Sequence, residues 1–247
     1  MDVVVYTFVI FWQWRAQERK FWNTCFQNQD PKKMSQLFFI HIRIKESSTP
    51  GMDLPMFLTK VTSLLGGYSS ATTCIHRFKV TGEPRIIAIY EVKNILGLER
   101  TMSGLSRMGV FDVECIPLLA YETFAKFLGV DQGLTQPSPH QITENQLFWL
   151  EFTLEYPGKK TEEFLAAWMI EATAALSARV VQGRQIDLFK VLAERKVHLF
   201  ISCSAEDLDK LSFTLPVMQE NGANTNIKCH ALQKLDDYTN RINKEHL

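Results

Sequence analysis

Ionisable side chains stand at regular positions inside otherwise apolar segments of this 247-residue chain. His41, Glu151 and His198 are three of them, and each lies two places from an aromatic residue. Residues two apart on a strand share one face. A desolvated pocket raises the pKa of a carboxyl group, and a histidine titrates near neutrality, so both residue types can move a proton at pH 7. The spacing therefore predicts His41, Glu151 and His198 as acid–base groups.

The same strand faces carry residues suited to hold a small, anionic organic molecule. The planar guanidinium of Arg43 can bind both oxygens of a carboxylate. Apolar walls with a few ionisable groups are typical of a small-molecule site. The predicted substrate-binding residues are Phe39, Arg43, Glu91, Glu114, Trp149, Phe200, Lys228 and His230. A structural alternative stays open, in which Arg43 pairs with Glu151 across an interface without chemistry.

Neither a metal nor a cofactor is predicted. A metal site built from His41, His198 and His230 lacks any local ligand spacing. His76 aligns with Asp187 in the repeat described below, and the residue types alone give that pair no stronger role. The chain has no glycine-rich phosphate loop, no GxSxG nucleophile elbow and no nucleotide-binding motif.

Overall composition narrows the range of partners. The 27 Lys and Arg balance 27 Asp and Glu, so no global field attracts nucleic acid or an anionic membrane. Five cysteines form no CxxC pair, which favours a reducing, cytoplasmic location over a disulfide framework. The apolar run at residues 3–12 is too short to span a bilayer and lacks the flanks of a secretory signal. The expected partner is a small molecule, and a homo-oligomer stays open.

A tandem repeat positions the candidate residues. Three blocks recur in the same order, each about 110 residues further along the chain. The pairs are Gln36–Ile40 with Gln146–Leu150, Phe78–Arg85 with Phe189–Lys196, and Val113–Leu118 with Ile227–Leu232. Chance similarity does not explain three matched blocks at a nearly constant offset. The predicted organisation is an N-terminal extension (1–35), a first repeat (36–128), a linker (129–145) and a second repeat (146–241).

Each repeat has the pattern strand, helix, strand, strand, helix, strand. Phe38–Lys45 alternates with the period of a half-buried strand. Pro55–Leu65 spaces apolar residues at helical intervals, and Gly66 and Gly67 end that helix. In the second copy, Glu163–Leu176 carries the matching helical stripe. This order predicts an α+β fold of two ferredoxin-like β-α-β-β-α-β units, each with both helices on one face of an antiparallel sheet.

The uncovered faces of the two sheets are expected to pack together as an α+β barrel within one chain. Alternation puts Ile86 and Ala88 on the helix side of the third strand and Ile87 on the inner side. Cys115 and Cys229 are predicted to be buried under the helices, because free cysteine is among the most buried residue types. The predicted site residues fall on the inner faces, so they would line the barrel.

The first repeat resembles the muconolactone isomerase-like family. Its third strand, Ile86–Val92, is followed by a helix and by Phe111–Leu118, whose order of aspartate, hydrophobic, glutamate, hydrophobic, any residue, proline and leucine is similar to the family's final strand. Arg77–Gly82 resembles the preceding hairpin. The resemblance covers most of residues 36–122 and, more weakly, 146–235. It implies a ferredoxin-like fold that pairs sheets and, in bacterial members, isomerises a small unsaturated lactone by proton transfer without a cofactor.

Two functions from different classes follow. The first is a cofactor-independent isomerase, cyclase or lyase that moves a proton on a small organic acid or lactone, with His41, Arg43 and Glu151 converging on one pocket in the barrel. The second is a non-catalytic small-ligand-binding or assembly module, with a filled interior in which the three inner aromatic rings meet as packing. Metal-free oxidation of an aromatic substrate is a third reading of the same barrel shape.

Overall fold

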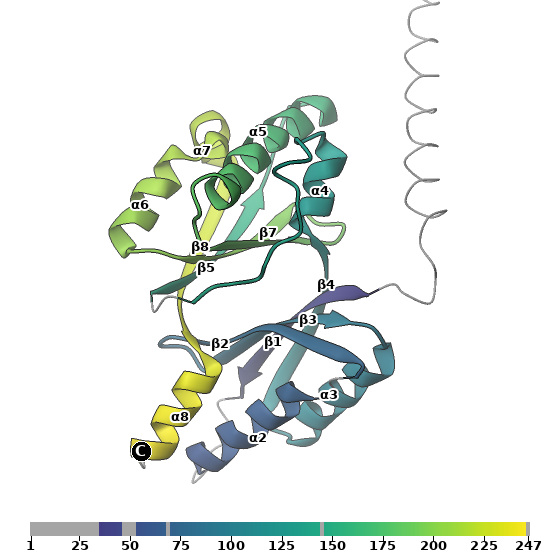
Figure 1. Ribbon diagram of the computed structural model, residues 1–247, viewed down its shortest axis with the longest axis vertical. Coiled ribbons are helices and arrows are strands. Elements are labelled where there is room, and N and C mark those ends of the chain that lie inside the picture. The colour runs from purple at the N-terminus through teal and green to yellow at the C-terminus, as the bar shows by residue number, and fades with distance from the viewer. Residues whose placement is uncertain (1–34, 46–52, 68–69, 144–145, 246–247) are drawn as a thin grey trace, which may run out of the picture. The chain divides into compact units, whose positions relative to one another are not determined.

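The computed structural model describes residues 35–45, 53–67, 70–143 and 146–245, which form two α+β halves (Figure 1). The first half contains β1 (Gln36–Ile44), α2 (Leu54–Gly66), β2 (Thr72–Val80), β3 (Arg85–Val92), α3 (Ile95–Arg107) and β4 (Phe111–Ala120). The second contains β5 (Leu147–Leu154), α5 (Thr161–Val180), β6 (Ile186–Val191), β7 (Lys196–Ser202), α6 (Ala205–Thr214), α7 (Pro216–Asn221), the short turn η2 (Gly222–Asn224) and β8 (Thr225–Lys234). One further helix ends each half, α4 (Tyr121–Leu128) and α8 (Leu235–Glu245). The predicted N-terminal extension lies outside the described residues, apart from its last residue.

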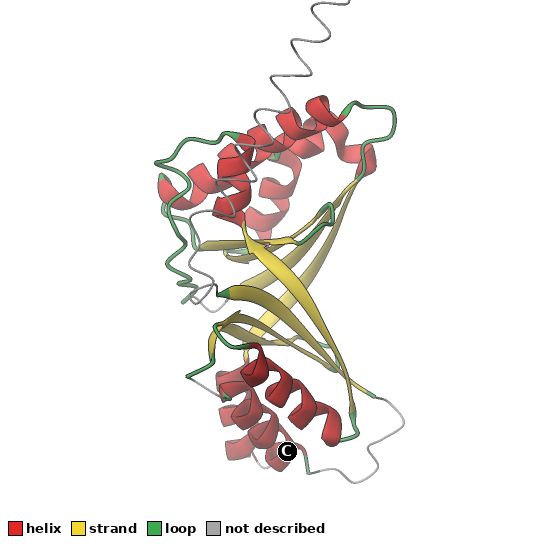
Figure 2. Ribbon diagram, turned by 90° about the vertical axis from the view of Figure 1, so that its right-hand side faces the viewer, coloured by secondary structure: helices red, strands yellow, loops and turns green. Residues whose placement is uncertain are grey.

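The strands close into one antiparallel barrel in the order β1-β3-β2-β8-β5-β7-β6-β4. β4 pairs with β1 along most of its length and then with β6, and β8 likewise passes from β5 to β2. Figure 2 shows the strands between two groups of helices. The predicted fold class, two tandem ferredoxin-like units packed sheet to sheet within one chain, is confirmed.

Side-chain caps mark where α2 and α6 begin. The Asp53 carboxylate accepts a hydrogen bond from the Met56 amide at the start of α2 (3.1 Å), and Ser204 Oγ accepts one from the Asp207 amide at the start of α6 (3.0 Å). Each satisfies an amide that has no partner within its helix. Gly67 ends α2 with a φ of 39°, a left-handed conformation that glycine adopts without the steric cost of a Cβ.

Three apolar cores follow from the strand alternation. Ile86 and Ala88 belong to the core under α2, α3 and α8, whereas Ile87 belongs to the core inside the barrel, as predicted. A third core lies under α4 to α7. The prediction that Cys115 and Cys229 are buried is wrong, because both are exposed. They lie on β4 and β8, whose outer faces the helices cover less fully than those of β3 and β7.

The two terminal helices are exchanged between the halves. α4 is the last helix of the first repeat in sequence, but Tyr121 and Ala125 are buried in the core of the second half. α8 is the last helix of the second repeat, but Leu235 and Ile242 are buried in the core of the first half. Each core therefore includes a helix contributed by the other repeat. This exchange couples the folding of the two halves, because either half alone would expose the apolar surface that the exchanged helix covers.

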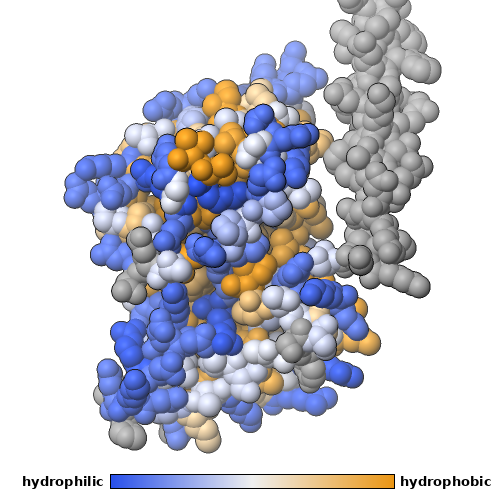
Figure 3. Space-filling model, in the orientation of Figure 1, coloured by the Kyte–Doolittle hydropathy of each residue, from blue (hydrophilic) through white to orange (hydrophobic). Residues whose placement is uncertain are grey.

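None of the described helices combines the length and apolar composition that a membrane span requires. Figure 3 shows apolar side chains at the surface over the helices of the second half, among mostly polar neighbours. Two large apolar residues of this half are exposed, Val181 at the end of α5 and Phe213 on α6.

Candidate functional site

Aromatic rings fill the middle of the barrel. Phe39, Trp149 and Phe200 are each 1% exposed. The ring centroids of Phe39 and Trp149 are 5.4 Å apart, and Trp149 stacks parallel to Phe200 at 6.4 Å. Phe78 and Phe189 belong to the same core. This packing matches what the non-catalytic reading expects of the interior, and it leaves the polar inner residues near the two ends of the barrel.

One end gathers all three predicted acid–base residues, and we call it the His41 end. It consists of His41, Glu83, Arg85, Glu151, His198 and His230. Phe39 stacks on His198 at a centroid distance of 4.5 Å, and Trp149 stacks on His230 at 4.7 Å. The Arg85 guanidinium lies 5.9 Å from the centre of the Trp149 ring. Because the same rings touch His41, His198 and His230, the filled core fixes the orientation of these polar groups.

Hydrogen bonding determines which nitrogen of His198 carries its proton. The indole nitrogen of Trp149 donates to His198 Nδ1 at 3.1 Å. An indole N–H can only donate, so Nδ1 must be the acceptor, and in the neutral ring the proton resides on Nε2. His198 is 1% exposed, and its Nε2 has no hydrogen-bond partner among the described residues. Nε2 is therefore a buried donor.

The same shortage of partners recurs beside His198. Arg85 Nε, His41 Nε2 and His230 Nε2 are also buried nitrogens without a hydrogen-bond partner among the described residues. Burying such a group unpaired costs about 1–3 kcal/mol, so native proteins normally supply a protein, water or ligand partner. Three of these four nitrogens belong to side chains that surround Trp149, namely Arg85, His198 and His230, and the fourth belongs to His41, whose ring lies beside Phe39.

His230 lies between two carboxylates. Its Nδ1 is 2.8 Å from Glu83 Oε1, and its Nε2 is 3.4 Å from Glu151 Oε1 without hydrogen-bond geometry. Glu83 also pairs with the Arg85 guanidinium at 2.8 Å. His230 thus has a carboxylate oxygen near each of its two ring nitrogens.

Burial keeps two of these histidines neutral. It lowers the pKa of His198 to about 3, with smaller contributions from the positive charge of Lys196 and from His41. Burial also lowers the pKa of His41, followed by the charge of Arg85, although the carboxylate of Glu114 acts in the opposite direction. A neutral imidazole can donate one hydrogen bond and accept another, so His198 stays a donor through Nε2 at neutral pH.

The buried His198 predicts a specific acid sensitivity. Its pKa is about 3 in the folded protein and about 6.5 when unfolded, so the unfolded state binds the extra proton as the pH falls below 6.5. The stability from this residue is present above pH 6.5 and is lost on acidification, at about 1.4 kcal/mol per pH unit between pH 6 and 4. Urea denaturation of wild type and His198→Gln over that range should show a shallower acid slope in the variant. Identical slopes would contradict the assignment.

The remaining predicted residues lie elsewhere. Arg43 is exposed at the end of β1, and Lys228 is exposed on β8, so neither reaches a closed interior. Glu114 has a side chain that is 66% exposed, and it lies 3.6 Å from His41. Glu91 is at the opposite end of β3 from Arg85. His41, Arg43 and Glu151 therefore do not converge on one enclosed pocket, because the side chains of the barrel centre occupy that space.

The other end of the barrel holds a second polar cluster, His76, His140 and Asp187, which we call the His76 end. His76 Nε2 and His140 Nδ1 each lie 2.7 Å from Asp187 Oδ2. Asp187 is 1% exposed, and its Oδ1 has no hydrogen-bond partner in the described part of the chain. Burial raises the pKa of Asp187, but hydrogen bonds from His140 and His76 outweigh burial and lower it to about 2.

A cavity of about 490 Å³ opens at the His76 end. It is lined by Gly66, Cys74, Ile75, His76, Arg77, Phe78, His140, Ile142, Lys234 and Asp236. Sequence reasoning noted that His76 and Asp187 are equivalent positions of the two repeats, which is why the barrel brings them together. It missed His140, because the linker gives no periodic signal. It also missed Arg85, although Arg85 lies two residues before Ile87 on the same strand and therefore shares its inner face.

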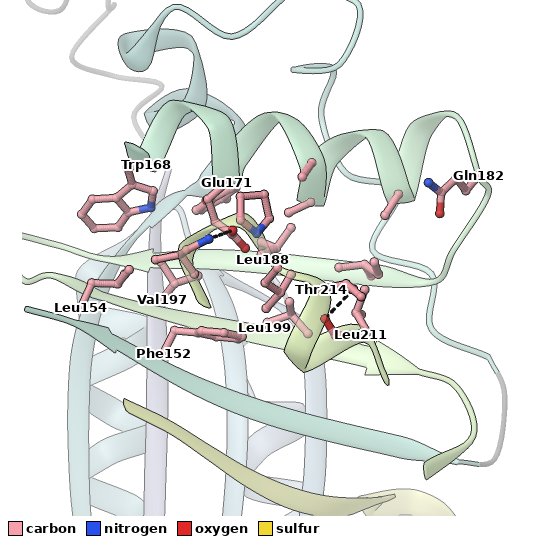
Figure 4. A pocket seen from close by; sticks show the side chains of 18 residues that line it. Phe152, Leu154, Trp168, Glu171, Gln182, Leu188, Val197, Leu199, Leu211 and Thr214 are labelled. Atoms are coloured by element: carbon pink, nitrogen blue, oxygen red, sulfur yellow. Dashed lines mark hydrogen bonds between the residues drawn. The ribbon is translucent and has the colours of Figure 1, made fainter. Parts of the chain in front are cut away.

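A second, mostly apolar cavity of about 200 Å³ lies between α5 and the sheet of the second half. Figure 4 shows Trp168, Glu171 and Leu188 around it. Glu171 accepts a hydrogen bond from the Val217 amide at 2.9 Å. Burial raises the pKa of Glu171, and this hydrogen bond opposes the rise.

Comparison with known proteins supports the fold alone. The chain matches no protein-family model and no curated protein in sequence. Among solved structures it is similar to chlorite dismutase from Candidatus Nitrospira defluvii. An arginine-to-glutamate mutant of that enzyme is 11% identical with a TM-score of 0.57, and its complex with imidazole is 11% identical with a TM-score of 0.53. Each match covers 85% of this chain and 95% of the other. The muconolactone isomerase-like resemblance therefore holds for the shared α+β barrel architecture, and the solved relatives have a different named activity.

Proposed function

We propose that this protein binds a small carbonyl-containing anion at the His41 end of the barrel and transfers a proton on it. The observation that carries this proposal is a set of four buried nitrogens without hydrogen-bond partners among the described residues, three of them in side chains around Trp149 (Arg85, His198 and His230) and the fourth in His41. Two of them are donors, His198 Nε2 and Arg85 Nε, as their chemistry requires. Donors fixed in a poorly solvated site stabilise an oxyanion more strongly than water does.

The proposed step divides the work between donors and a base. His230 takes a proton from the carbon next to the carbonyl group, and the carboxylates of Glu83 and Glu151 stabilise the resulting imidazolium. His198 and Arg85 hold the enolate oxygen that forms. Return of the same proton to a different carbon completes an isomerisation, so no redox partner is needed. The substrate lies at the mouth of the barrel, because aromatic rings fill the middle.

The fold relatives belong to a haem-binding superfamily, but the described residues that line the cavity between α5 and the sheet do not fit a haem. The cavity between α5 and the sheet measures about 200 Å³, below the range of about 300–1,000 Å³ of ordinary ligand pockets. Its described lining contains no His, Cys or Met. Tyr121 is the one lining residue of a type that ligates haem iron, and burial raises its pKa far above neutrality. No step is assigned to that group.

Hydrogen–deuterium exchange on candidate substrates tests the proposal even though the natural substrate is not identified. Purified protein is incubated in D₂O with a panel of lactones and 2-keto acids, and NMR follows the loss of the hydrogen next to the carbonyl group. We expect His230→Gln to reduce the fastest exchange rate by at least about 100-fold, the usual contribution of a general base, and Glu151→Gln to reduce it less. Glu206→Gln is the matched control, because Glu206 is exposed on α6.

The outcomes separate the two function classes. Wild-type rates in His230→Gln would contradict the assigned base. Saturable binding of a panel member that needs Arg85, without any exchange, would favour a non-catalytic ligand-binding module. This second function has its own support in the tightly packed barrel centre, which needs no catalytic explanation.

A further inference from the structure

We infer that His76, His140 and Asp187 form a binding site for a divalent first-row transition metal ion, with Zn²⁺ and Fe²⁺ as the matching ions. The site lies at the His76 end, away from the residues of the proposed proton transfer, and the inference does not depend on that function. Two imidazoles and one carboxylate are a recurrent ligand set for catalytic Zn²⁺ and for non-haem Fe²⁺.

The positions of the three ligand atoms are compatible with one ion. His76 Nε2, His140 Nδ1 and an Asp187 oxygen all lie within 4.8 Å of one another. Metal–ligand distances of about 2.0–2.2 Å in a tetrahedral site separate ligand atoms by roughly 3.4 Å. The two contacts to Asp187 Oδ2 are 2.7 Å, so these two pairs need to move apart by less than about 1 Å. The two histidine nitrogens lie within 4.8 Å of each other, so they need to approach by no more than about 1.4 Å. Small rotations about the side-chain bonds provide that shift.

The surroundings hold these side chains in place. His76 stacks on Phe78 at a centroid distance of 5.5 Å, and His140 stacks on Phe189 at 6.0 Å with an interplanar angle of 11°. His140 has a φ of 52°, which non-glycine residues seldom adopt. The linker thus places this ring against Asp187 by its tertiary contacts.

Burial of Asp187 supports a cation as the partner. The carboxylate is 1% exposed, and its Oδ1 has no hydrogen-bond partner in the described residues. Buried carboxylates are normally paired with a cation or bound to a metal. A metal ion would let both histidines act as neutral ligands, and Oδ1 would lie within reach of the same ion. Without a metal, the cluster is a hydrogen-bonded link between the two halves.

The cavity of about 490 Å³ gives the ion room for further ligands. His76 and His140 line this cavity, together with Lys234 and the ion pair of Arg77 with Asp236. Three protein ligands leave at least one coordination position for water or a small molecule. The cavity would therefore present an exchangeable position to solvent, as a reactive metal site does and a closed structural site does not.

Metal titration of the full chain tests the inference. The protein is stripped with a chelator and titrated with Co²⁺, which gives visible absorption bands on binding, and separately with Zn²⁺ by calorimetry. We expect one ion per chain with a dissociation constant in the micromolar range or below. His140→Ala should weaken binding by at least about 100-fold, because it removes a direct ligand, whereas changes to outer partners alone cost 10–100-fold. His41→Ala is the matched control and should bind like wild type.

A stability readout keeps the test decisive if a variant folds poorly. An excess of Zn²⁺ should raise the melting temperature of wild type by about 5 °C or more, because ligands of the folded state stabilise it by mass action. That rise should be absent in His140→Ala, whose change lies in a surface linker. Asp187→Asn is nearly isosteric and keeps a hydrogen-bonding side chain. Because an amide oxygen is a weaker metal ligand than a carboxylate, this variant should bind the metal ion poorly. Absence of stoichiometric binding by wild type, or equal affinity in His140→Ala, would overturn the inference.

Discussion

Replacing Arg179 with methionine is expected to lower the free energy of unfolding by about 3–5 kcal/mol. Arg179 on α5 forms an ion pair with Glu122 on α4, and both side chains are 7% exposed. Its guanidinium also donates to the backbone oxygen of Gln136 at 3.2 Å. The variant leaves the Glu122 carboxylate buried without a cation, and that uncompensated charge is the source of the loss. Urea denaturation measures the change directly.

A double variant separates the ion pair from simple packing. Glu122→Leu combined with Arg179→Met removes both charges, so its loss should be much smaller than that of Arg179→Met alone. Lys210→Met is the control for an exposed pair, because Lys210 and Glu206 on α6 are 68% and 78% exposed. It should change stability by less than about 0.5 kcal/mol. A loss below 1 kcal/mol for Arg179→Met would mean that water reaches Glu122.

The consequence extends beyond one helix pair. Glu122 belongs to the last helix of the first repeat, and Arg179 belongs to the second repeat. Their pairing holds the exchanged helix α4 in the core of the second half. α8 has a corresponding contact, in which the Arg77 guanidinium of β2 binds Asp236 at 2.6 Å. That pair is more exposed, so the first half depends more on apolar burial of Leu235 and Ile242.

Strand alternation and the tandem repeat together predicted the barrel. A one-residue shift of register would turn every apolar residue to the other face. The alternation of Ile86 and Ile87 along the strand therefore assigned the helix side and the inner side of the sheet correctly. The match between the repeats then predicted two similar sheets. Each sheet has one face without helices, and the two such faces can be buried by packing against each other.

Depth along the barrel axis was not predictable in the same way. Alternation places Arg43 and Phe39 on one inner face, but Phe39 is 1% exposed in the middle and Arg43 is exposed at the rim. Only the stagger between strands decides which inner residues meet in the centre, and the sequence does not encode it locally. The place of His140 in the cluster with His76 and Asp187 was even less predictable from the sequence. Its position depends on how an aperiodic linker packs against β6, which follows from tertiary contacts alone.

Replacing Trp149 with alanine is expected to cost about 3–5 kcal/mol of unfolding free energy, because it removes one of the largest fully buried side chains and leaves a cavity. The ring is 1% exposed and contacts Phe39, Phe200 and His230. Its indole nitrogen also donates to His198 Nδ1. Phe213→Ala is the control, since Phe213 is 69% exposed on α6 and should lose less than about 0.5 kcal/mol.

Trp149→Phe distinguishes packing from hydrogen bonding at the same position. Phenylalanine fills most of the space but cannot donate, so the loss should be about 1–3 kcal/mol, as for a buried acceptor left unpaired. His198 would then be free to move its proton to Nδ1, which nitrogen-15 shifts of the imidazole report. The His41 end would lose a fixed donor while the barrel stays folded. If the shifts of His198 were the same in Trp149→Phe and wild type, the ring would serve only as packing, and the proton-transfer proposal would lose its oriented donor.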